Sequence, residues 1–433
     1  MKKDIIKTKD VIVSGFALFA IFFGAGNLIL PPFMGLQAGK SWILAWIGFS
    51  LSGPGLTALG MIAMAKNQGD AEKFAGKVGI KFSILLGSLV ILFIGPLMSV
   101  PRTGATTFEI SVLPFFPNFS PLLFSIIFFG ITLYFSISKS KIIDIIGTYM
   151  TPFLLITLLT IILKGIFTPI ANTAIAGSNQ LSIGFLEGYH TMDSLSPMVI
   201  AGMIISNFKE KGIESKNALT RYTVYTELIA ATGLILIYGG LTFLGAKISP
   251  IVSSGLGRTE LLNVMVNYLL GSYGNIFLSI IVALACLTTA IGLTTATGDF
   301  FSKVSNNRLK YKHIVIVSIL ISAFLSIIGV EGIISFSVPI LVTLYPVVIV
   351  LTFLNLLDDY IKNSLIYKTT VYFTLGVSLI IGIEAAGFKD LFIVKLFSKF
   401  PLWKIGFGWV SFSFLGLILG IVFSKFIIKP NKR

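Results

Sequence analysis

"FFGAGNLILPP", residues 22–32, interrupts an apolar run that is long enough to cross a membrane. Glycine loosens a helical backbone, and Asn27 carries polar atoms that hydrocarbon cannot satisfy. A helix that only spans a bilayer would carry Leu or Ile at these central positions. The stretch, which ends in Pro31 and Pro32, therefore predicts a membrane helix that stops and restarts near residues 24–27.

The composition around this stretch is that of a membrane protein. Of the 433 residues, 55% are hydrophobic and only 12% are charged, whereas a soluble domain carries about 25% charged residues. Apolar stretches of about 20 residues recur along the chain, and each is long enough to cross a bilayer. We predict an all-α polytopic membrane protein that forms a single transmembrane domain over residues 1–433. Twelve spans are expected near 11–35, 43–65, 82–110, 119–137, 142–163, 185–207, 217–244, 274–301, 314–329, 333–356, 370–386 and 405–428.

The net charge of +15 indicates orientation rather than a nucleic-acid partner. With the N-terminus inside, 24 Lys and Arg residues fall on the cytoplasmic side of the predicted spans and 8 on the outer side. This bias follows the positive-inside rule, so both termini are expected in the cytoplasm. The longest loop, over residues 245–273, is expected outside. A single cysteine, Cys286, excludes an internal disulfide, and two histidines without cysteine partners make a structural metal site improbable.

A second interrupted span follows in the later half of the chain. "FLEGYHTMDSLSPMVIAGMIISN", residues 185–207, is polar in its first part and apolar in its second. Interrupted segments at corresponding positions of two halves are typical of transporters built from inverted repeats. The two segments are the first and sixth spans, and an odd number of spans per repeat inverts the second repeat. We expect repeats at about 11–163 and 185–356 with appended helices at about 370–428; the alternative for span six is an amphipathic re-entrant segment.

A break in mid-membrane frees two kinds of backbone group. The N–H groups that begin the outer half favour an anion, and the C=O groups that end the inner half favour a cation. Here the N–H groups of residues 25–27 would hold a carboxylate, and the carbonyls near Ala20 and Phe23 would face a cation. Together they indicate a zwitterion that travels with a coupling ion. The alternative, a glycine-rich packing contact, explains Gly24 and Gly26 but leaves Asn27 unexplained.

Hydroxyl groups cluster in the eighth predicted span, "ALACLTTAIGLTTATGDFF", residues 283–301. Thr288 and Thr289 lie near its centre, one turn after the carbonyl of Ala285. Such a set of neutral, hard oxygens suits Na⁺ better than a softer or more highly charged metal. The alternative is that these threonines only bond carbonyls of their own helix.

Two opposite charges lie in the third predicted span, "GPLMSVPRTGATTFEI", residues 95–110. Arg102 and Glu109 are seven residues apart, which places them two turns apart on one helix face. Charges inside a membrane are costly, so they are usually paired or functional. We regard the two as a candidate charge pair or as gating residues. The same question applies to three further acidic residues in predicted spans: Glu187, Asp193 and Glu227.

Three of these stretches resemble one transporter family. "FALFAIFFGAGNLILPP" (16–32), "GPLMSVPRTGATTFEI" (95–110) and "GFLEGYHTMDSLSPMV" (184–199) are similar to the branched-chain amino-acid:cation symporters, the bacterial system II carriers of Leu, Ile and Val. The resemblance runs through essentially the whole chain. It implies secondary active uptake of these amino acids across the bacterial plasma membrane, driven by Na⁺ or, in some members, by H⁺. It also implies the LeuT-like fold, a five-plus-five inverted repeat with broken helices 1 and 6.

A more distant resemblance is to the bacterial leucine transporter LeuT itself. Its first helix has a Gly-x-Gly-Asn pattern, and its eighth has an Ala-Gly-Leu-Thr-Ser pattern that is matched here over residues 285–289. The resemblance implies that the substrate carboxylate lies at Gly24, Ala25, Gly26 and Asn27. It implies a Na⁺ site made by the carbonyls of Ala20, Phe23 and Ala285 and the hydroxyls of Thr288 and Thr289. No secure counterpart of a second sodium site is found.

These observations predict a Na⁺-coupled importer of branched-chain amino acids. Its aliphatic pocket is expected between spans one, three, six and eight, and its partners are the amino acid and the lipid bilayer. An enzyme is not expected, since no nucleophile–base or paired-histidine set is present, and neither are the repeated pore rings of a channel. No cofactor is expected beyond the coupling ion. The substrate ammonium is expected on freed carbonyls of span six, near Gly188, Tyr189, His190 and Thr191.

Overall fold

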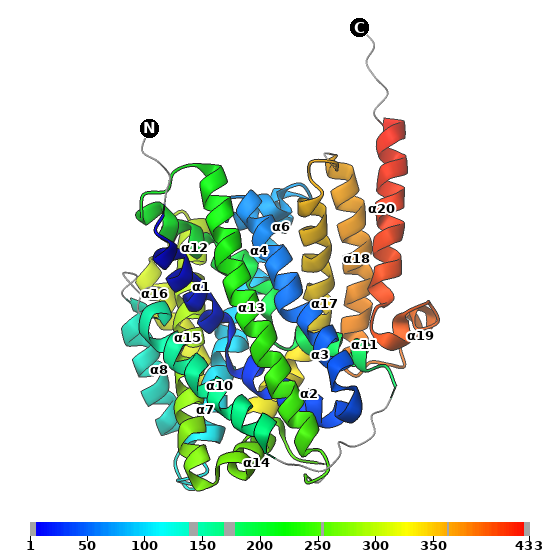
Figure 1. Cartoon of the computed structure of the whole chain (residues 1–433). Helices are drawn as coiled ribbons and strands as arrows, with labels where there is room; N and C mark the ends of the chain where they lie inside the picture. The colour runs from blue at the N-terminus through cyan, green and yellow to red at the C-terminus, as the bar shows by residue number, and fades with distance from the viewer. Residues whose placement is uncertain (1–5, 138–145, 169–177, 253–254, 362, 428–433) are drawn as a thin grey trace.

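The computed structural model describes residues 6–427 apart from 138–145, 169–177, 253–254 and 362. The described part is a bundle of helices that contains no strand, and the long helices such as α13 (Lys216–Ile248), α17 (Val330–Leu356) and α18 (Ser364–Ala385) run roughly side by side (Figure 1). This confirms the predicted all-α membrane architecture. The beginning of the expected span 142–163 lies partly outside the described residues.

The first half of the chain forms three broken or kinked spans before its regular helices. The helix α1 ends at Phe22 and α2 begins at Ala25, so the first span is broken as predicted. Pro54 and Pro96 lie in π-helical turns that join α3 to α4 and α6 to α7, because proline removes a backbone donor and kinks a helix. The helices are α1 (Thr8–Phe22), α2 (Ala25–Ala38), α3 (Trp42–Ser50), α4 (Leu56–Lys66), α5 (Ala71–Gly76), α6 (Ile80–Leu92), α7 (Ser99–Ser111), α8 (Pro121–Ile137) and α10 (Thr151–Phe167).

The second half repeats the broken span at its start. The helix α11 ends at Tyr189 and α12 begins at Pro197, which confirms the second predicted break. The helices are α11 (Gln180–Tyr189), α12 (Pro197–Glu210), α13 (Lys216–Ile248), α14 (Arg258–Leu270), α15 (Ser272–Val304), α16 (Tyr311–Ser326), α17 (Val330–Leu356), α18 (Ser364–Ala385), α19 (Phe392–Phe397) and α20 (Gly408–Ile427).

Eight helical stretches among the described residues are long and apolar enough to cross a membrane, and α8 and α16 are shorter apolar helices. The count of twelve spans therefore stays a prediction. One expectation is wrong: the segment 245–273 is not only a loop, because it contains the 13-residue helix α14. Its apolar residues recur at helical spacing and are buried in the bundle: Leu261, Leu262, Met265, Val266 and Leu269.

Glycines bring the half-helices next to the breaks into close backbone contact with their neighbours. A Cβ at Gly35 of α2 would overlap the Thr242 carbonyl of α13, and one at Gly245 of α13 would overlap Pro32 of α2. The same relation joins α11 to α3, through Gly184 and Gly48. The first span thus packs on the seventh as the sixth packs on the second. The predicted division of the chain into two repeats stays a prediction.

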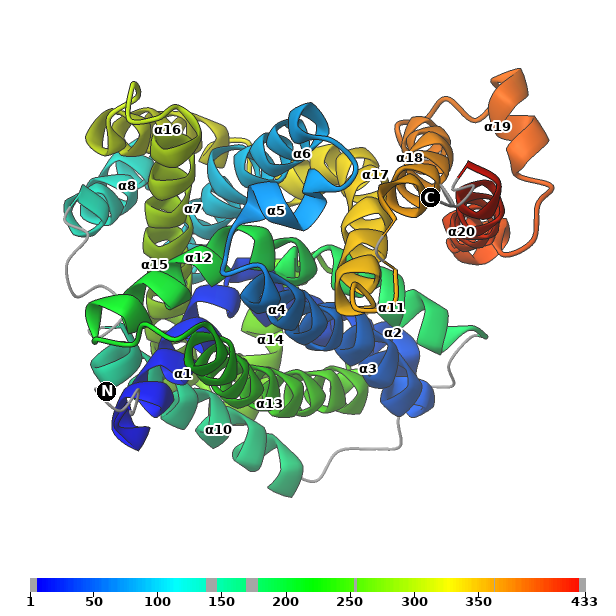
Figure 2. The same cartoon turned by 90° about the horizontal axis from the view of Figure 1, so that it is seen from above.

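The beginning of α1 and the end of α20 lie at the same side of the bundle, which we call the terminal face (Figure 1). Seen along the bundle, α15 and α13 lie near α1, whereas α18 and α20 stand at one edge (Figure 2). The appended helices therefore lie outside the group of helices that surrounds the two breaks.

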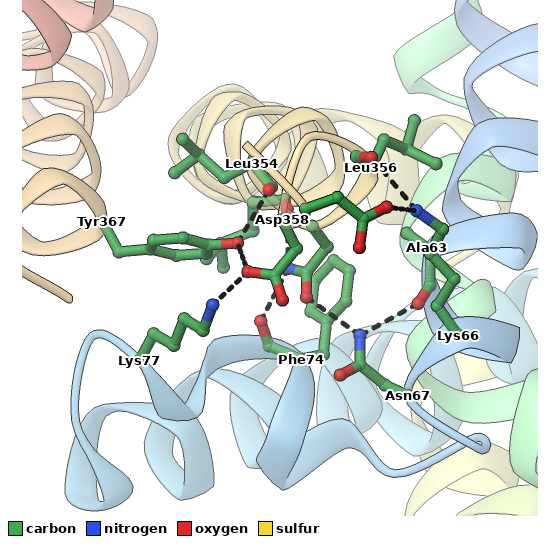
Figure 3. A network of polar contacts seen from close by, with 12 residues as sticks. Ala63, Lys66, Asn67, Phe74, Lys77, Leu354, Leu356, Asp358 and Tyr367 are labelled. Atoms are coloured by element: carbon green, nitrogen blue, oxygen red, sulfur yellow. Dashed lines mark hydrogen bonds and ion pairs between the residues drawn. The ribbon is translucent and has the colours of Figure 1, made fainter. Parts of the chain in front are cut away.

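A polar network at the terminal face joins α4 and the turn after α5 to the end of α17 and to α18 (Figure 3). Lys77 forms an ion pair with Asp358, whose Oδ1 also accepts a hydrogen bond from Tyr367 Oη at 2.7 Å. Partial burial opposes ionisation of Asp358, but the bonds from Lys77 and Tyr367 and the charges of Lys77 and Lys66 hold the pKa of its carboxyl below the usual value. Asn355 adds a bond of 2.8 Å to a carbonyl of α5. The carboxyl group of Asp358 is therefore ionised at neutral pH.

Candidate functional site

The first break is only two residues long. Phe23 leaves the helix with ψ 76°, and Gly24 is extended with φ −102° and ψ −160°. The first backbone bond of α2 runs from Leu28 N–H to Gly24 O at 3.3 Å, so the N–H groups of residues 25–27 have no acceptor within the helix. All three residues are buried. The break is shorter than expected, because Asn27 belongs to the first turn of α2 rather than to unwound chain.

The carbonyl end of the same break meets α15. Thr289 Oγ1 donates to Ala20 O at 3.0 Å and to Ile21 O at 2.9 Å, as alternative acceptors for one hydroxyl proton. Thr288 Oγ1 lies 3.2 Å from Ala20 O and 3.0 Å from Ala285 O. The structure therefore brings together four of the five groups predicted for the Na⁺ site. Ile21 O is a further oxygen at this place, which the residue pattern did not single out.

The remaining predicted ligand, the carbonyl of Phe23, belongs to the break itself. Its neighbour Gly24 faces Thr289, since a Cβ at Gly24 would lie 2.9 Å from Thr289 Cγ2. The set contains only neutral hydroxyl and carbonyl oxygens, the donors that fit a small monovalent cation. The alternative that these threonines bond only carbonyls of their own helix is wrong, because both hydroxyls bond carbonyls at the end of α1. Their geometry fits a cation site and equally a simple cap on the end of α1. The Na⁺ site stays a prediction.

The second break is a tight turn in which the predicted carbonyls are already bonded. The N–H and Oγ1 of Thr191 both donate to Gly188 O, at 3.3 and 2.8 Å, and Met192 N–H donates to Tyr189 O at 3.1 Å. The carbonyl of His190 accepts a bond from Arg102. An ammonium group near these residues would therefore find only their remaining lone pairs. This competition weakens the prediction that span six holds the ammonium through free carbonyls.

A buried polar cluster joins the two breaks. The Asn27 amide donates to Asp193 Oδ1 at 2.9 Å and to Oδ2 at 2.8 Å, and Tyr238 Oη donates to Asp193 Oδ2 at 3.0 Å. The exposed fractions of the three side chains are 1%, 2% and 0%. Tyr238 was missed by the sequence reading, because a single tyrosine in the apolar α13 has no pattern that distinguishes it from packing.

Arg102 and Glu109 do not pair with each other. Arg102 is 1% exposed, and its Nη1 donates to His190 O at 2.6 Å. Glu109 lies at the other end of α7, where its oxygens accept bonds from Val330 N–H at 2.8 Å and Thr259 Oγ1 at 2.9 Å. The two-turn spacing is correct, but each charge faces different neighbours, so the charge-pair alternative for these two residues is wrong.

Two of the other acidic residues in the predicted spans remain without hydrogen bonds on some of their oxygens. Both carboxylate oxygens of Glu227 in α13 and Oε2 of Glu187 in α11 are buried with no partner among the described residues. Glu187 meets the second break only through its backbone carbonyl, which accepts a bond from His190 N–H at 3.0 Å. Asp193 is the acidic residue that lies at a break.

A polar contact closes the side opposite the terminal face. Arg258, the first residue of α14, donates to Glu331 of α17 at 2.8 Å, and its guanidinium lies 4.6 Å from the ring centre of Phe33 in α2. Together with the bonds of Glu109, this contact ties α2, α7, α14 and α17 together.

A cavity of about 730 Å³ opens at the terminal face, lined by residues 68–72, by α12 and by the last part of α15. Its lining includes Met198 and Thr295, which follow Asp193 by five residues and Thr289 by six. The groups at the breaks are buried, so short segments of α12 and α15 separate them from this cavity. This cavity therefore approaches the groups at the breaks along α12 and α15.

Known proteins resemble this chain over its whole length. The family described as "Branched-chain amino acid transport protein" matches residues 7–427. The chain is 39% identical over 444 residues to the branched-chain amino acid permease BraB of Bacillus subtilis, covering 100% of this chain and 99% of the permease. It is 34% identical over 434 residues to the branched-chain amino acid transport system 2 carrier protein of Pseudomonas aeruginosa, covering 99% of each.

Solved structures confirm the architecture at the level of the fold. The chain is similar to Mhp1, a nucleobase-cation-symport-1 family transporter in a closed conformation with bromovinylhydantoin bound, with a TM-score of 0.60 and 14% identity over 97% of this chain and 92% of that one. It is also similar to MhsT in complex with L-phenylalanine, with a TM-score of 0.54 and 15% identity over 94% of this chain and 97% of that one. With its two broken spans, the chain therefore has the predicted LeuT-like fold.

Proposed function

The chain belongs to the branched-chain amino acid transport protein family, and from this premise we propose that it imports Leu, Ile and Val together with Na⁺ by alternating access. The protein is a transporter and not an enzyme, since the relatives that it matches along their length are named permeases and carriers. The amino-acid class is supported by the family. The cation, the individual substrates and the direction of transport are our proposal.

The single observation that carries this proposal is the pairing, at the first break, of N–H and C=O groups that have no backbone partner within their own helices. Buried N–H groups begin α2 and buried carbonyls end α1, only two residues apart. Such groups are stable in a membrane only beside a ligand or a polar cavity. An amino acid supplies a carboxylate for the N–H groups, and Na⁺ supplies a charge for the carbonyls and for Thr288 and Thr289.

The arrangement of the two faces supports alternating access. Contacts from Arg258 and Glu109 close one face, whereas the cavity of about 730 Å³ opens at the other. We take the terminal face to be cytoplasmic, because the predicted charge bias places both termini there. The cavity is then the exit path of the imported amino acid into the cell.

The proposed orientation predicts which segments face each compartment. Single cysteines placed in 66–81 are expected to react with a membrane-impermeant maleimide only from the cytoplasm, and those in 245–273 only from outside. Labelling of intact cells and of inverted vesicles measures this difference, with the buried Cys286 as internal background. Reaction of both segments from the same side would show that the span count is wrong.

The proposed substrates are tested by competition in proteoliposomes that take up labelled leucine. Unlabelled Leu, Ile and Val are each expected to compete. Valine lacks one methylene of leucine, which contributes roughly 1–3 kcal/mol in an apolar pocket, so valine is expected to bind no more than about 200-fold more weakly than leucine. Glutamate and lysine are expected not to compete. Stronger competition by a small or polar neutral amino acid than by leucine would contradict the proposed substrate class.

One observation favours a second candidate, an H⁺-coupled transporter of the same fold for another neutral amino acid. Asp193 is a titratable group that lies between both breaks and binds only the neutral donors Asn27 and Tyr238. A proton that binds this carboxyl would neutralise its negative charge, and the proton could then serve as the coupling ion. The choice between the two depends on the ion dependence of transport.

A further inference from the structure

Arg102 is a buried cation that forms no ion pair in the described part of the chain, where the carboxylate of Asp193 acts on it through its charge without a bond. Its side chain is 1% exposed, and none of the ion pairs between described residues includes it. Its hydrogen bond of 2.6 Å goes to the neutral carbonyl of His190, and its Nε has no partner among the described residues. A charge in this situation is costly in a membrane, and such residues mark places where an opposite charge binds.

The guanidinium of Arg102 faces the first turn of α2. A Cβ built on Gly26 would lie 2.5 Å from Nη2 and 2.8 Å from Cζ, so the two groups are in contact. The same turn carries the unbonded N–H groups of residues 25–27 and the positive end of a 14-residue helix. Two positive groups thus meet at one buried place. They repel each other, and an anion that lies beside both of them would relieve this repulsion.

We propose that Arg102 binds the carboxylate of the transported amino acid and holds it against the first turn of α2. The inference rests on the proposed function. It makes the Arg102 side chain of α7 the main ligand of the substrate carboxylate, in addition to the backbone N–H groups of the first break. The carbonyl of His190 orients the guanidinium from the second break. Asp193, whose carboxylate accepts hydrogen bonds from Asn27 and Tyr238, supplies the balancing negative charge.

The chemistry of the guanidinium defines the ligand class. Its planar fork binds both oxygens of a carboxylate at once, and it stays charged at any physiological pH. Ligands are therefore α-amino acids with a free carboxylate, and amides or amines of the same shape are excluded. Lysine at this position would keep the charge but lose the two-point contact.

Binding of L-leucine and L-leucinamide to the purified protein in saturating Na⁺ tests this role. The amide keeps the side chain and the ammonium but lacks the negative charge, so wild-type protein is expected to bind it at least about 30-fold more weakly than leucine. In Arg102→Gln, leucine binding is expected to fall about 30-fold to more than 1,000-fold, whereas leucinamide binding changes little. Arg102→Lys is expected to give an intermediate leucine affinity. Arg221→Gln removes an exposed guanidinium of α13 and is expected to change neither ligand.

The outcomes separate the inference from the proposed function. A wild-type protein that binds no branched-chain amino acid overturns the proposed function, whatever Arg102 does. A wild-type protein that binds leucine overturns the inference alone if it binds leucinamide equally well, or if Arg102→Gln keeps the wild-type ratio of the two affinities. If Arg102→Gln fails to fold, Arg102→Lys decides: it is expected to reduce the preference for leucine over leucinamide, and an unchanged preference overturns the inference.

Discussion

Gly26→Val is expected to abolish leucine binding while the protein still inserts into the membrane. The valine Cβ would lie 2.5 Å from Arg102 Nη2, so the guanidinium would have to move, and its methyl groups would fill the space beside the N–H groups that begin α2. Insertion depends on the apolar length of the spans, which this change leaves intact. Leucine binding to the purified variant, measured with its melting temperature, is the test.

Gly130→Val in α8 is the matched control for this change. Nothing lies within 4 Å of a Cβ at Gly130, so the same substitution there meets open space. It is expected to leave leucine binding at the wild-type level. Wild-type leucine affinity in Gly26→Val would mean that the substrate does not lie beside the first turn of α2.

Thr289→Ala is expected to weaken Na⁺ binding about ten- to hundred-fold. The hydroxyl lies 3.0 and 2.9 Å from the last free carbonyls of α1, and a hydrogen-bonding contact to a charged group contributes roughly 1.5–3 kcal/mol. Because binding linkage is reciprocal, leucine affinity should fall at low Na⁺ and largely recover at saturating Na⁺. Titrations of leucine binding at a series of Na⁺ concentrations measure this shift.

Thr297→Ala provides the comparison within the same helix. Thr297 Oγ1 donates to Leu293 O of its own helix at 2.8 Å and so has the contact that a purely structural threonine makes. Its removal is expected to change the Na⁺ dependence much less. If Thr289→Ala leaves the Na⁺ dependence unchanged, the cation is not held between α1 and α15, and the two threonines serve only to cap α1.

Both breaks could be predicted from the sequence because glycine, asparagine and a run of polar residues are out of place in a membrane helix. The contact between Thr289 and the end of α1 was also predicted, but this prediction came from the resemblance to LeuT rather than from residue spacing. The length of the first break was not predicted. Asn27 is a polar residue with a tertiary partner, and its bonds to Asp193 stabilise it inside a helical turn.

The sequence could not show which charges meet. Arg102 and Glu109 lie on one helix face, yet α7 is long enough to place them against different helices: one against the second break and the other against α14 and α17. Pairings between distant segments depend on the packing of the whole bundle. The helix α14 was missed for a different reason, because its apolar spacing was visible but its low hydropathy led to a loop assignment.

Leucine uptake into proteoliposomes, measured at equal pH on both sides with external Na⁺ replaced by choline, tests the proposed Na⁺ coupling. With an inward Na⁺ gradient, labelled leucine is expected to accumulate transiently above its equilibrium level, because Na⁺ and leucine bind at one break and move together. With choline, uptake should reach equilibrium at most. Equal accumulation in choline, or accumulation driven by a pH gradient without Na⁺, would contradict Na⁺ coupling and favour a proton as the coupling ion.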